Sequence, residues 1–239
     1  MEVEGVILAC SGGFGTVEVG WDGQWVKSGL TGIVYLTPAK VGWAFSPPVK
    51  MASGPEKRID FKGRVTCPVR QITRGDGHFV ALKDDGTVWA WGGNACGALG
   101  NASNKDQKFP IGVFLPYDVI AVAAGDGFGV ALRRDGSVWT WGRNDYGQLG
   151  DEYCSESSRW VPSRNSISRV TAIDAGRHHA LALKDDGTVW AWGGNASGQL
   201  GNARTDQSAR PVMAVRLEGV IAIAAGHEHS LALRQDGTV

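Results

Sequence analysis

The chain has 239 residues and carries 24 basic and 24 acidic side chains, so its formal net charge is zero. A balanced charge provides no general attraction to nucleic acid or to an anionic membrane, and we expect neither as a partner. Hydrophobic residues make up 43% of the chain, which is ordinary for a folded protein, and no apolar run is long enough to span a bilayer. The composition is unusual in its 35 glycines and ten tryptophans, most of which come from a repeated segment.

The N-terminus and the cysteines give limited information on the compartment. The first residues, MEVEGVILACSGG, are acidic where a secretory signal is basic, and we expect a strand there. The four cysteines are far apart and include no Cys-x-x-Cys pair: Cys10, Cys67, Cys96 and Cys154. We therefore expect free thiols and no metal site, which slightly favours the cytoplasm over an oxidising compartment.

One segment recurs along the chain with a nearly constant spacing. KDDGTVWAWGGNACGALG begins at Lys83, RRDGSVWTWGRNDYGQLG at Arg133 and KDDGTVWAWGGNASGQLG at Lys184. A glycine stands ten residues before each Asp-Gly pair, and successive glycines are 50, 51 and 50 residues apart: Gly75, Gly125, Gly176 and Gly226. A steady period of this length predicts an array of similar structural units.

Each copy begins with two short apolar runs that we expect to be strands. Val119–Ala124 and Phe128–Arg133 show this in one copy, since both are too short for a helix and lack its 3.6-residue period. Asp135 and Gly136 follow, where we expect a two-residue hairpin turn with positive φ.

The second half of each copy predicts two further strands. Trp139 and Trp141 are two residues apart on the third strand, so both point to one face of the sheet. A glycine-rich turn comes next, and the stretch around Pro162 predicts a fourth, outer strand, because proline is tolerated at sheet edges. First strands carry alanines and third strands carry tryptophans, which suits a wedge that is narrow near a central axis. Such a sheet has two apolar faces and buries them only against its neighbours.

The pattern GxxHxxAL-x-x-DGxVWxWGxNxxGQLG resembles the repeat of the RCC1 (regulator of chromosome condensation) family. The residues that carry this resemblance recur in each copy and include His78, Asp85, Gly86, Trp89, Trp91, Asn94, Leu99, Asp135, Gly136, Trp139, Trp141, Asn144, Gln148, His179, Trp190, Trp192, Asn195, Gln199, His229 and Asp236. The resemblance implies a β-propeller, which in this family has seven blades. It also implies, from eukaryotic relatives, an inserted wedge that works on a small GTPase.

We therefore expect an all-β fold, an incomplete β-propeller of four-stranded antiparallel blades with about four blades and a partial one. Residues 1–68 form a degenerate first blade in this interpretation, since Gly12 stands ten residues before Asp22 and Gly23. Three clear blades follow at residues 69–117, 118–168 and 169–217, and residues 218–239 form a partial blade. Closing the ring then requires further blades or another chain, and we favour a fragment of a longer protein.

The first copy carries about 13 more residues than the others, between Pro47 and Gly75. Its segment from Lys50 to Arg64 holds five basic and two acidic residues around a Gly-Pro pair and is typical of an exposed loop or hairpin. A solvated loop is the simpler interpretation. The functional alternative is a partner-binding loop, for which the candidate residues are Lys57, Arg58, Lys62 and Arg64.

The sequence contains no combination of nucleophile, base and orienting acid, so we expect no catalytic residues, no cofactor and no enzyme activity. His78, His179 and His229 share one repeat position, and we expect packing rather than metal binding, because a propeller rotation keeps them apart. The predicted function is a protein-interaction scaffold with loops on a rigid propeller. The alternatives are an exchange-factor-like regulator of a small GTPase and an inhibitor of a partner enzyme. The partner itself is not identified by the sequence.

Overall fold

The computed structural model describes residues 68–152 and 158–239, and the backbone of six strands between residues 6 and 65. The chain divides into two compact units, Met1–Pro68 and Val69–Val239. The first unit contains β1 (Val6–Cys10), β2 (Thr16–Val19), β3 (Ile33–Ala39), β4 (Trp43–Ser46), β5 (Lys50–Ser53) and β6 (Lys62–Val65).

The first unit differs from the later repeats in the order of its strands. Its larger sheet has the order β2-β1-β3-β5, so β1 lies between β2 and β3, and β4 pairs separately with β6. The segment from Lys50 to Arg64 is not a hairpin of its own, because β5 pairs with β3 and β6 pairs with β4. The assignment of residues 1–68 as a degenerate blade stays a prediction.

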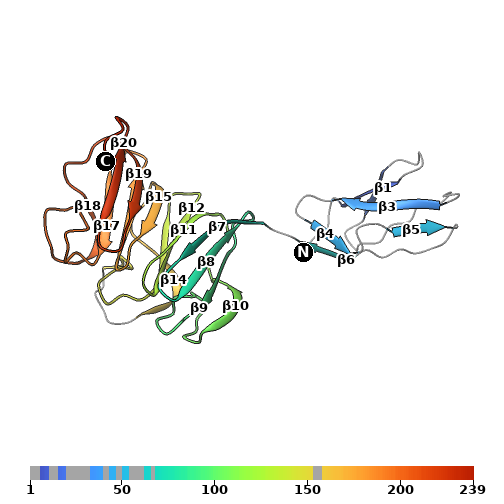
Figure 1. The fold of residues 1–239 in the computed structure, drawn as a ribbon, viewed down its shortest axis with the longest axis horizontal. Helices are drawn as coiled ribbons and strands as arrows, with labels where there is room; N and C mark the ends of the chain where they lie inside the picture. The colour runs from blue at the N-terminus through green and yellow to red at the C-terminus, as the bar shows by residue number, and fades with distance from the viewer. Residues whose placement is uncertain are drawn as a thin grey trace. The chain divides into compact units, whose positions relative to one another are not determined.

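The second unit consists of antiparallel sheets that lie side by side, as Figure 1 shows. Three of these sheets have four strands in sequence order: β7 (Val69–Arg74), β8 (His78–Lys83), β9 (Val88–Gly92) and β10 (Gln107–Gly112); β11 (Val119–Ala124), β12 (Phe128–Arg133), β13 (Val138–Gly142) and β14 (Arg159–Arg164); β15 (Val170–Ala175), β16 (His179–Lys184), β17 (Val189–Gly193) and β18 (Ser208–Met213). A two-stranded sheet follows, with β19 (Val220–Ala225) and β20 (Ser230–Arg234).

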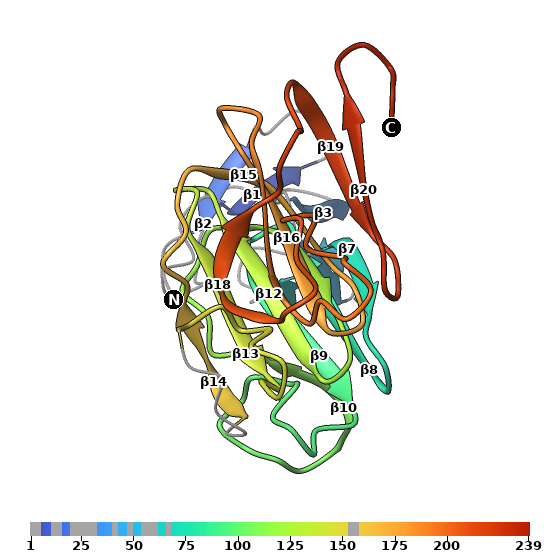
Figure 2. The ribbon, with the colours of Figure 1, turned by 90° about the vertical axis from the view of Figure 1, so that its left-hand side faces the viewer.

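These sheets confirm the expected all-β blades. The predicted outer strand is β14, which contains Pro162 and pairs only with β13 among the described residues. The first strands β7, β11, β15 and β19 are neighbours across successive sheets, so they form the inner edge of the array. In Figure 2 the hairpin of β19 and β20 continues the array beyond β15 and β16. Among the described residues no helix is long and apolar enough to cross a membrane.

The Asp-Gly turns differ in type from the expected two-residue hairpin. Only the glycine has positive φ, 75° at Gly136, and Asp135 does not. Gly136 N–H donates to the Arg133 carbonyl at 2.9 Å, and Arg133 N–H donates to the Ser137 carbonyl at 3.0 Å, which describes a type I turn closed by a left-handed glycine. The Asp135 carboxylate selects this turn, because it accepts hydrogen bonds from the Ser137 N–H and hydroxyl at 3.0 and 2.5 Å.

Tryptophans of the third strands fill the space between neighbouring sheets. Trp141 is fully buried against residues of the preceding sheet such as Leu82 and Val88, and Trp139 packs against the same cluster, so the two indoles share a face as predicted. The Trp141 indole N–H donates to the Ala98 carbonyl at 2.8 Å. One sheet later, the buried Trp192 donates to the Gln148 carbonyl at 2.9 Å. Each indole therefore buries a large apolar area and still satisfies its polar N–H.

The indoles pack against the glycine-rich turn of the preceding sheet, and the side chain of a buried asparagine stabilises the conformation of this turn. Asn94 is fully buried, its Nδ2 donates to the Ser103 and Lys105 carbonyls at 2.9 and 3.1 Å, and its Oδ1 accepts from the Leu99 N–H at 2.9 Å. The equivalent Asn195 is also buried with its Nδ2 bonded. Residues 195–197, Asn-Ala-Ser, match the N-x-S/T glycosylation pattern, but the buried amide of Asn195 is not accessible for modification.

Replacing the bridging indole should destabilise the unit strongly. Trp141→Ala removes a fully buried side chain and leaves the Ala98 carbonyl without its donor, so we expect a loss of about 3–5 kcal/mol in the free energy of unfolding. Urea unfolding followed by circular dichroism measures this loss. Trp91→Ala, at the same repeat position but only half-buried, is the matched control and should lose less. Equal losses in the two variants would contradict a bridging role.

A second pair of variants isolates the packing of an outer strand on the preceding glycine-rich turn. Gly147 and Gly198 occupy one repeat position and have nearly the same φ, 75° and 76°. A Cβ on Gly147 would lie 2.6 Å from the Cα of Ala209 on β18, whereas a Cβ on Gly198 would meet nothing within 4 Å. Both Gly→Ala changes incur the same backbone strain, but only Gly147→Ala also overlaps β18. Calorimetry should therefore show a larger loss in the free energy of unfolding for Gly147→Ala than for Gly198→Ala, by about 1–3 kcal/mol. A smaller drop for Gly147→Ala than for Gly198→Ala would be inconsistent with this contact.

Candidate interaction face at the inner strand ends

The inner strands end at glycines that hold neighbouring sheets close together. A Cβ on Gly125 would overlap the Phe128 ring and the Gly176 carbonyl, so no other residue fits between these sheets. Main-chain hydrogen bonds then join the residues that follow the glycines. Asp126 N–H donates to the Arg177 carbonyl at 2.8 Å, and Arg177 N–H donates to the His227 carbonyl at 3.1 Å. The main chain at this end of the array is therefore a rigid frame.

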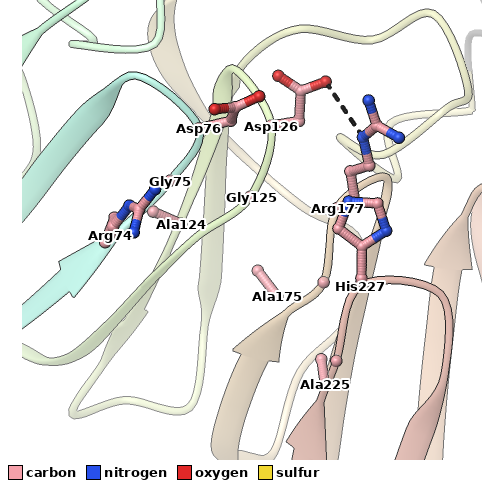
Figure 3. A pocket seen from close by; sticks show the side chains of 12 residues that line it. Arg74, Gly75, Asp76, Ala124, Gly125, Asp126, Ala175, Arg177, Ala225 and His227 are labelled. Atoms are coloured by element: carbon pink, nitrogen blue, oxygen red, sulfur yellow. Dashed lines mark ion pairs between the residues drawn. The ribbon is translucent and has the colours of Figure 1, made fainter.

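The frame surrounds a cavity of about 480 Å³, which we call the axial mouth. Three consecutive residues from the end of each inner strand line it: 74–76, 124–126, 175–177 and 225–227. Glycine occupies the middle position in all four sheets, while the position after it holds Asp76, Asp126, Arg177 and His227. Figure 3 shows the carboxylates of Asp76 and Asp126 near each other on one side of the mouth, with Arg177 and His227 on the other. At this position the mouth has an acidic side and a basic side, and Arg74, from the strand that leads to Asp76, adds a further positive charge to the lining.

Ion pairs fix part of this arrangement. Arg143, from the loop after β13, binds Asp126 at 2.9 Å and Asp145 at 2.5 Å. The hydrogen bond to Asp145, with the nearby charge of Asp126, raises the pKa of Arg143, so the guanidinium stays charged. Arg177 reaches the same Asp126 oxygen at 3.9 Å. Asp126 is therefore held in place, whereas Asp76 is exposed and makes no ion pair within the described residues.

A stacked pair of aromatic rings lies beside the mouth. The His178 ring stacks on Tyr146, with ring centroids 4.5 Å apart, and its Nδ1 lies 3.8 Å from Asp126. Burial lowers the pKa of His178, and the cations Arg177 and Arg143 lower it further against the opposite effect of Asp126. His178 is consequently uncharged at neutral pH and adds an apolar surface next to the charged side chains.

The repeat-position histidines pack against the frame rather than face the mouth. His78 and His179 are almost fully buried, and each ring covers the axial glycine of its own sheet, Gly75 and Gly176. Phe128 fills the same position in the intervening sheet, which indicates that a flat ring is what the site requires. Among the described residues no three histidine, cysteine or acidic side chains lie close enough together to hold a metal ion.

The candidate residues from the sequence belong to the first unit. Lys57 and Arg58 are outside the described residues, and Lys62 and Arg64 belong to β6 of the first unit, where only the backbone is described. Their proposed role as a partner-binding loop is untested. The axial mouth was not predicted from the sequence. The signal for it was the residue after each axial glycine, which is aspartate in two copies, arginine in the third and histidine in the fourth, while the glycine itself is constant.

The sequence and the fold match those of known proteins. The family model for the RCC1-like domain matches residues 19–239. The chain belongs to this family. Human E3 ubiquitin-protein ligase HERC2 is 36% identical over 150 residues, which are 61% of this chain and 3% of that protein. Mouse probable E3 ubiquitin-protein ligase HERC4 is 44% identical over 148 residues, which are 61% of this chain and 14% of that protein. The RCC1-like chain therefore spans a small part of these relatives.

Solved structures show the same fold. The yeast RCC1 (Prp20) chain in its complex with Kap60 has a TM-score of 0.63 and 24% sequence identity, with coverage of 97% of this chain and 54% of that chain. Prp20p from Saccharomyces cerevisiae, in another structure, has a TM-score of 0.61 and 18% identity, with coverage of 97% and 56%. At these identities the likeness concerns the fold alone, and the RCC1-like chain spans about half of the solved propeller.

Because His179 is buried, we expect the folded protein to lose stability in acid. Burial, with the nearby His229 and His178, lowers the pKa of His179 from 6.5 to about 4, so the folded protein favours the neutral ring. Stability is then full above pH 6.5 and falls as the pH drops towards 4, by up to roughly 3 kcal/mol at about 1.4 kcal/mol per pKa unit.

His179→Phe, which copies Phe128, should remove this part of the pH dependence. Thermal unfolding measured at several pH values between 7 and 4 provides the comparison, with the exposed His227→Gln as control. An equal acid dependence in His179→Phe and the original protein would rule His179 out as its source.

Proposed function

We propose that this RCC1-like unit is a protein-binding module and that a partner docks over the axial mouth. One observation carries the proposal. The repeat position that directly follows the axial glycine of each sheet places its four side chains around one cavity: Asp76, Asp126, Arg177 and His227. Repeat positions whose side chains pack between the sheets keep the same residues from copy to copy, because a change there would disrupt the packing. A position that changes charge while its neighbour stays constant is free of that requirement and is available for recognition.

The chemistry of the mouth favours a protein partner over a reacting substrate. The cavity is open and only about 480 Å³ in volume, and its ionic groups bind one another through Arg143, Asp126 and Arg177. Opposite charges on the two sides orient a partner and exclude those with the wrong pattern. Family relatives support binding of this kind: yeast RCC1 was crystallised with Kap60, and Prp20p is described with binding to Gsp1p and histones.

A charge exchange at the mouth tests the proposal. The double variant Asp76→Lys with Arg177→Glu reverses both sides of the mouth and leaves the net charge unchanged, and both side chains are exposed. The matched control, Arg134→Glu with Glu218→Lys, exchanges exposed charges at the opposite ends of the strands. We expect quantitative affinity capture to recover the same partner with the original chain and the control, and at least tenfold less with the mouth variant. Equal recovery with both double variants would place recognition elsewhere.

A second candidate function is regulation of a small GTPase through nucleotide exchange, for which the inserted segment is the proposed contact. Family membership favours it, and Lys57, Arg58, Lys62 and Arg64 supply the positive charge. Changing these four residues to alanine should abolish capture of a GTPase and slow the release of its bound nucleotide. Retention of a partner that is not a GTPase supports the scaffold function, including inhibition of a partner enzyme.

A further inference from the structure

The contact between the sheets β11–β14 and β15–β18 carries large side chains that the fold does not require. Both sheets have four paired strands and a further sheet on either side, so this contact lies inside the array. The glycine-rich turn of the first of these two sheets holds three large side chains: Arg143, Asp145 and Tyr146. The turns of the other two four-stranded repeats hold small residues at the same positions: Gly93, Ala95, Cys96, Gly194, Ala196 and Ser197.

The turn has the same conformation with small and with large side chains. Its second glycine has a φ of 76°, 75° and 76° in the three sheets, at Gly97, Gly147 and Gly198. The N–H of this glycine donates to the carbonyl of the buried asparagine at 2.9, 3.0 and 2.9 Å. The large side chains of one turn are therefore not needed to form it, and they are available for recognition.

Two of these side chains belong to a row of alternating charges that crosses the contact between the sheets. Arg143 pairs with Asp145 at 2.5 Å and with Asp126 at 2.9 Å. Nε of Arg177 lies 3.9 Å from the same Asp126 oxygen, the pair that Figure 3 marks. We call these four residues the charged row. Its inner members, Arg143 and Asp126, neutralise each other.

The two ends of the charged row are open to solvent. Asp145 and Arg177 have side chains that are 38% and 42% exposed. Within the described part of the chain, the second oxygen of Asp145 and the terminal nitrogens of Arg177 have no partner. The row therefore ends in one available carboxylate and one available guanidinium.

The stacked rings of Tyr146 and His178 lie next to these ends. Tyr146 follows Asp145 in the turn, and His178 follows Arg177. Tyr146 is 38% exposed, so the stack presents aromatic surface to solvent. A Cβ on Gly194 would lie 3.2 Å from the His178 Cβ, so the glycine of the next turn leaves room for the pair. Tyrosine and arginine are the residue types that most often dominate the binding energy of protein interfaces.

We propose that the charged row and the aromatic stack anchor the docked partner, and that the partner presents an apolar side chain flanked by a cation and a carboxylate. This anchor rests on the proposed function, because Asp126 and Arg177 belong both to the row and to the lining of the axial mouth. The cation pairs with Asp145 and the carboxylate with Arg177, which extends the alternation at both ends. The apolar side chain packs on Tyr146. A partner with two like charges meets a like charge at one end and is excluded.

The test selects binders from a display library of random peptides on the immobilised 239-residue chain. We expect the selected peptides to carry a basic and an acidic residue on either side of an apolar one. Tyr146→Ser, which copies Ser197, should weaken their binding about tenfold or more, because it removes the aromatic anchor. Asp145→Ala, which copies Ala196, should weaken it about fivefold. Cys96→Ser, at the same repeat position as Tyr146 one sheet earlier, is the matched control and should leave the affinity unchanged.

An exchange of charge separates recognition from a structural effect. Replacing the basic residue of a selected peptide by glutamate should weaken its binding to the original chain. The same peptide should regain affinity for the Asp145→Lys variant, because the pair is restored with reversed charges. Loss of affinity for both peptides in Asp145→Lys would contradict the assigned pairing.

The outcomes for the anchor and for the proposed function are distinguishable. Equal binding by Tyr146→Ser and the original chain overturns the anchor. If those peptides are lost from the double variant Asp76→Lys with Arg177→Glu, docking at the mouth stands without it, and if they are retained there, both proposals are wrong. Selection of no peptide also overturns the anchor, and affinity capture then decides on the mouth. A dimer in sedimentation experiments that Tyr146→Ser dissociates would assign this surface to a second copy of the chain and overturn the proposal.

Discussion

The contact between an indole and a main-chain carbonyl of the preceding sheet supports the rest of this structure. Each sheet of the array has apolar side chains on both faces, so it cannot bury them alone. Trp141 and Trp192 close the gap where neighbouring sheets diverge, and their N–H groups remove the polar cost of filling it with an aromatic ring. The glycine-rich turn exists to receive them, because a side chain at Gly100 or Gly150 would occupy the space of the indole. The tryptophans and the glycine-rich turn of the repeat therefore form the two sides of each contact between neighbouring sheets.

The packing between neighbouring sheets also determines how the inner strands are arranged. Successive sheets repeat the same order of strands, so residues about 50 positions apart take equivalent places in neighbouring sheets. The axial glycines allow the inner strands to approach until main-chain hydrogen bonds link one sheet to the next. The side chain after each glycine then projects from a rigid support at no cost to the core. Recognition and stability are consequently carried by adjacent residues with different roles.

The polar groups of this RCC1-like chain are divided in the same way. Asn94 and the Asp-Gly turns satisfy main-chain groups within their own sheets and are structural. His78 and His179 are buried rings that cover glycines, and a phenylalanine does the same work in one sheet. The side chains that follow the axial glycines have no such role. Together with Arg74 they are the polar side chains that line one opening: Asp76, Asp126, Arg177 and His227. Family membership agrees with a binding role for such an opening, while the family fold by itself specifies no partner.

The amino-acid sequence by itself determined the period, the short antiparallel strands, the outer position of the proline-containing strand and the shared face of Trp139 and Trp141. These features depend on contacts within one repeat or on the alternation of side chains along one strand, which local sequence encodes directly. The turn type at Asp135 was the local exception, because the side-chain hydrogen bond to Ser137 decided between two turns that accept the same residues. Only the tertiary structure decided that Asp76, Asp126, Arg177 and His227 share one mouth and that the indoles of Trp141 and Trp192 meet carbonyls of the preceding sheet. Both depend on the rotation from one sheet to the next, and that rotation comes from packing between repeats rather than from any one of them.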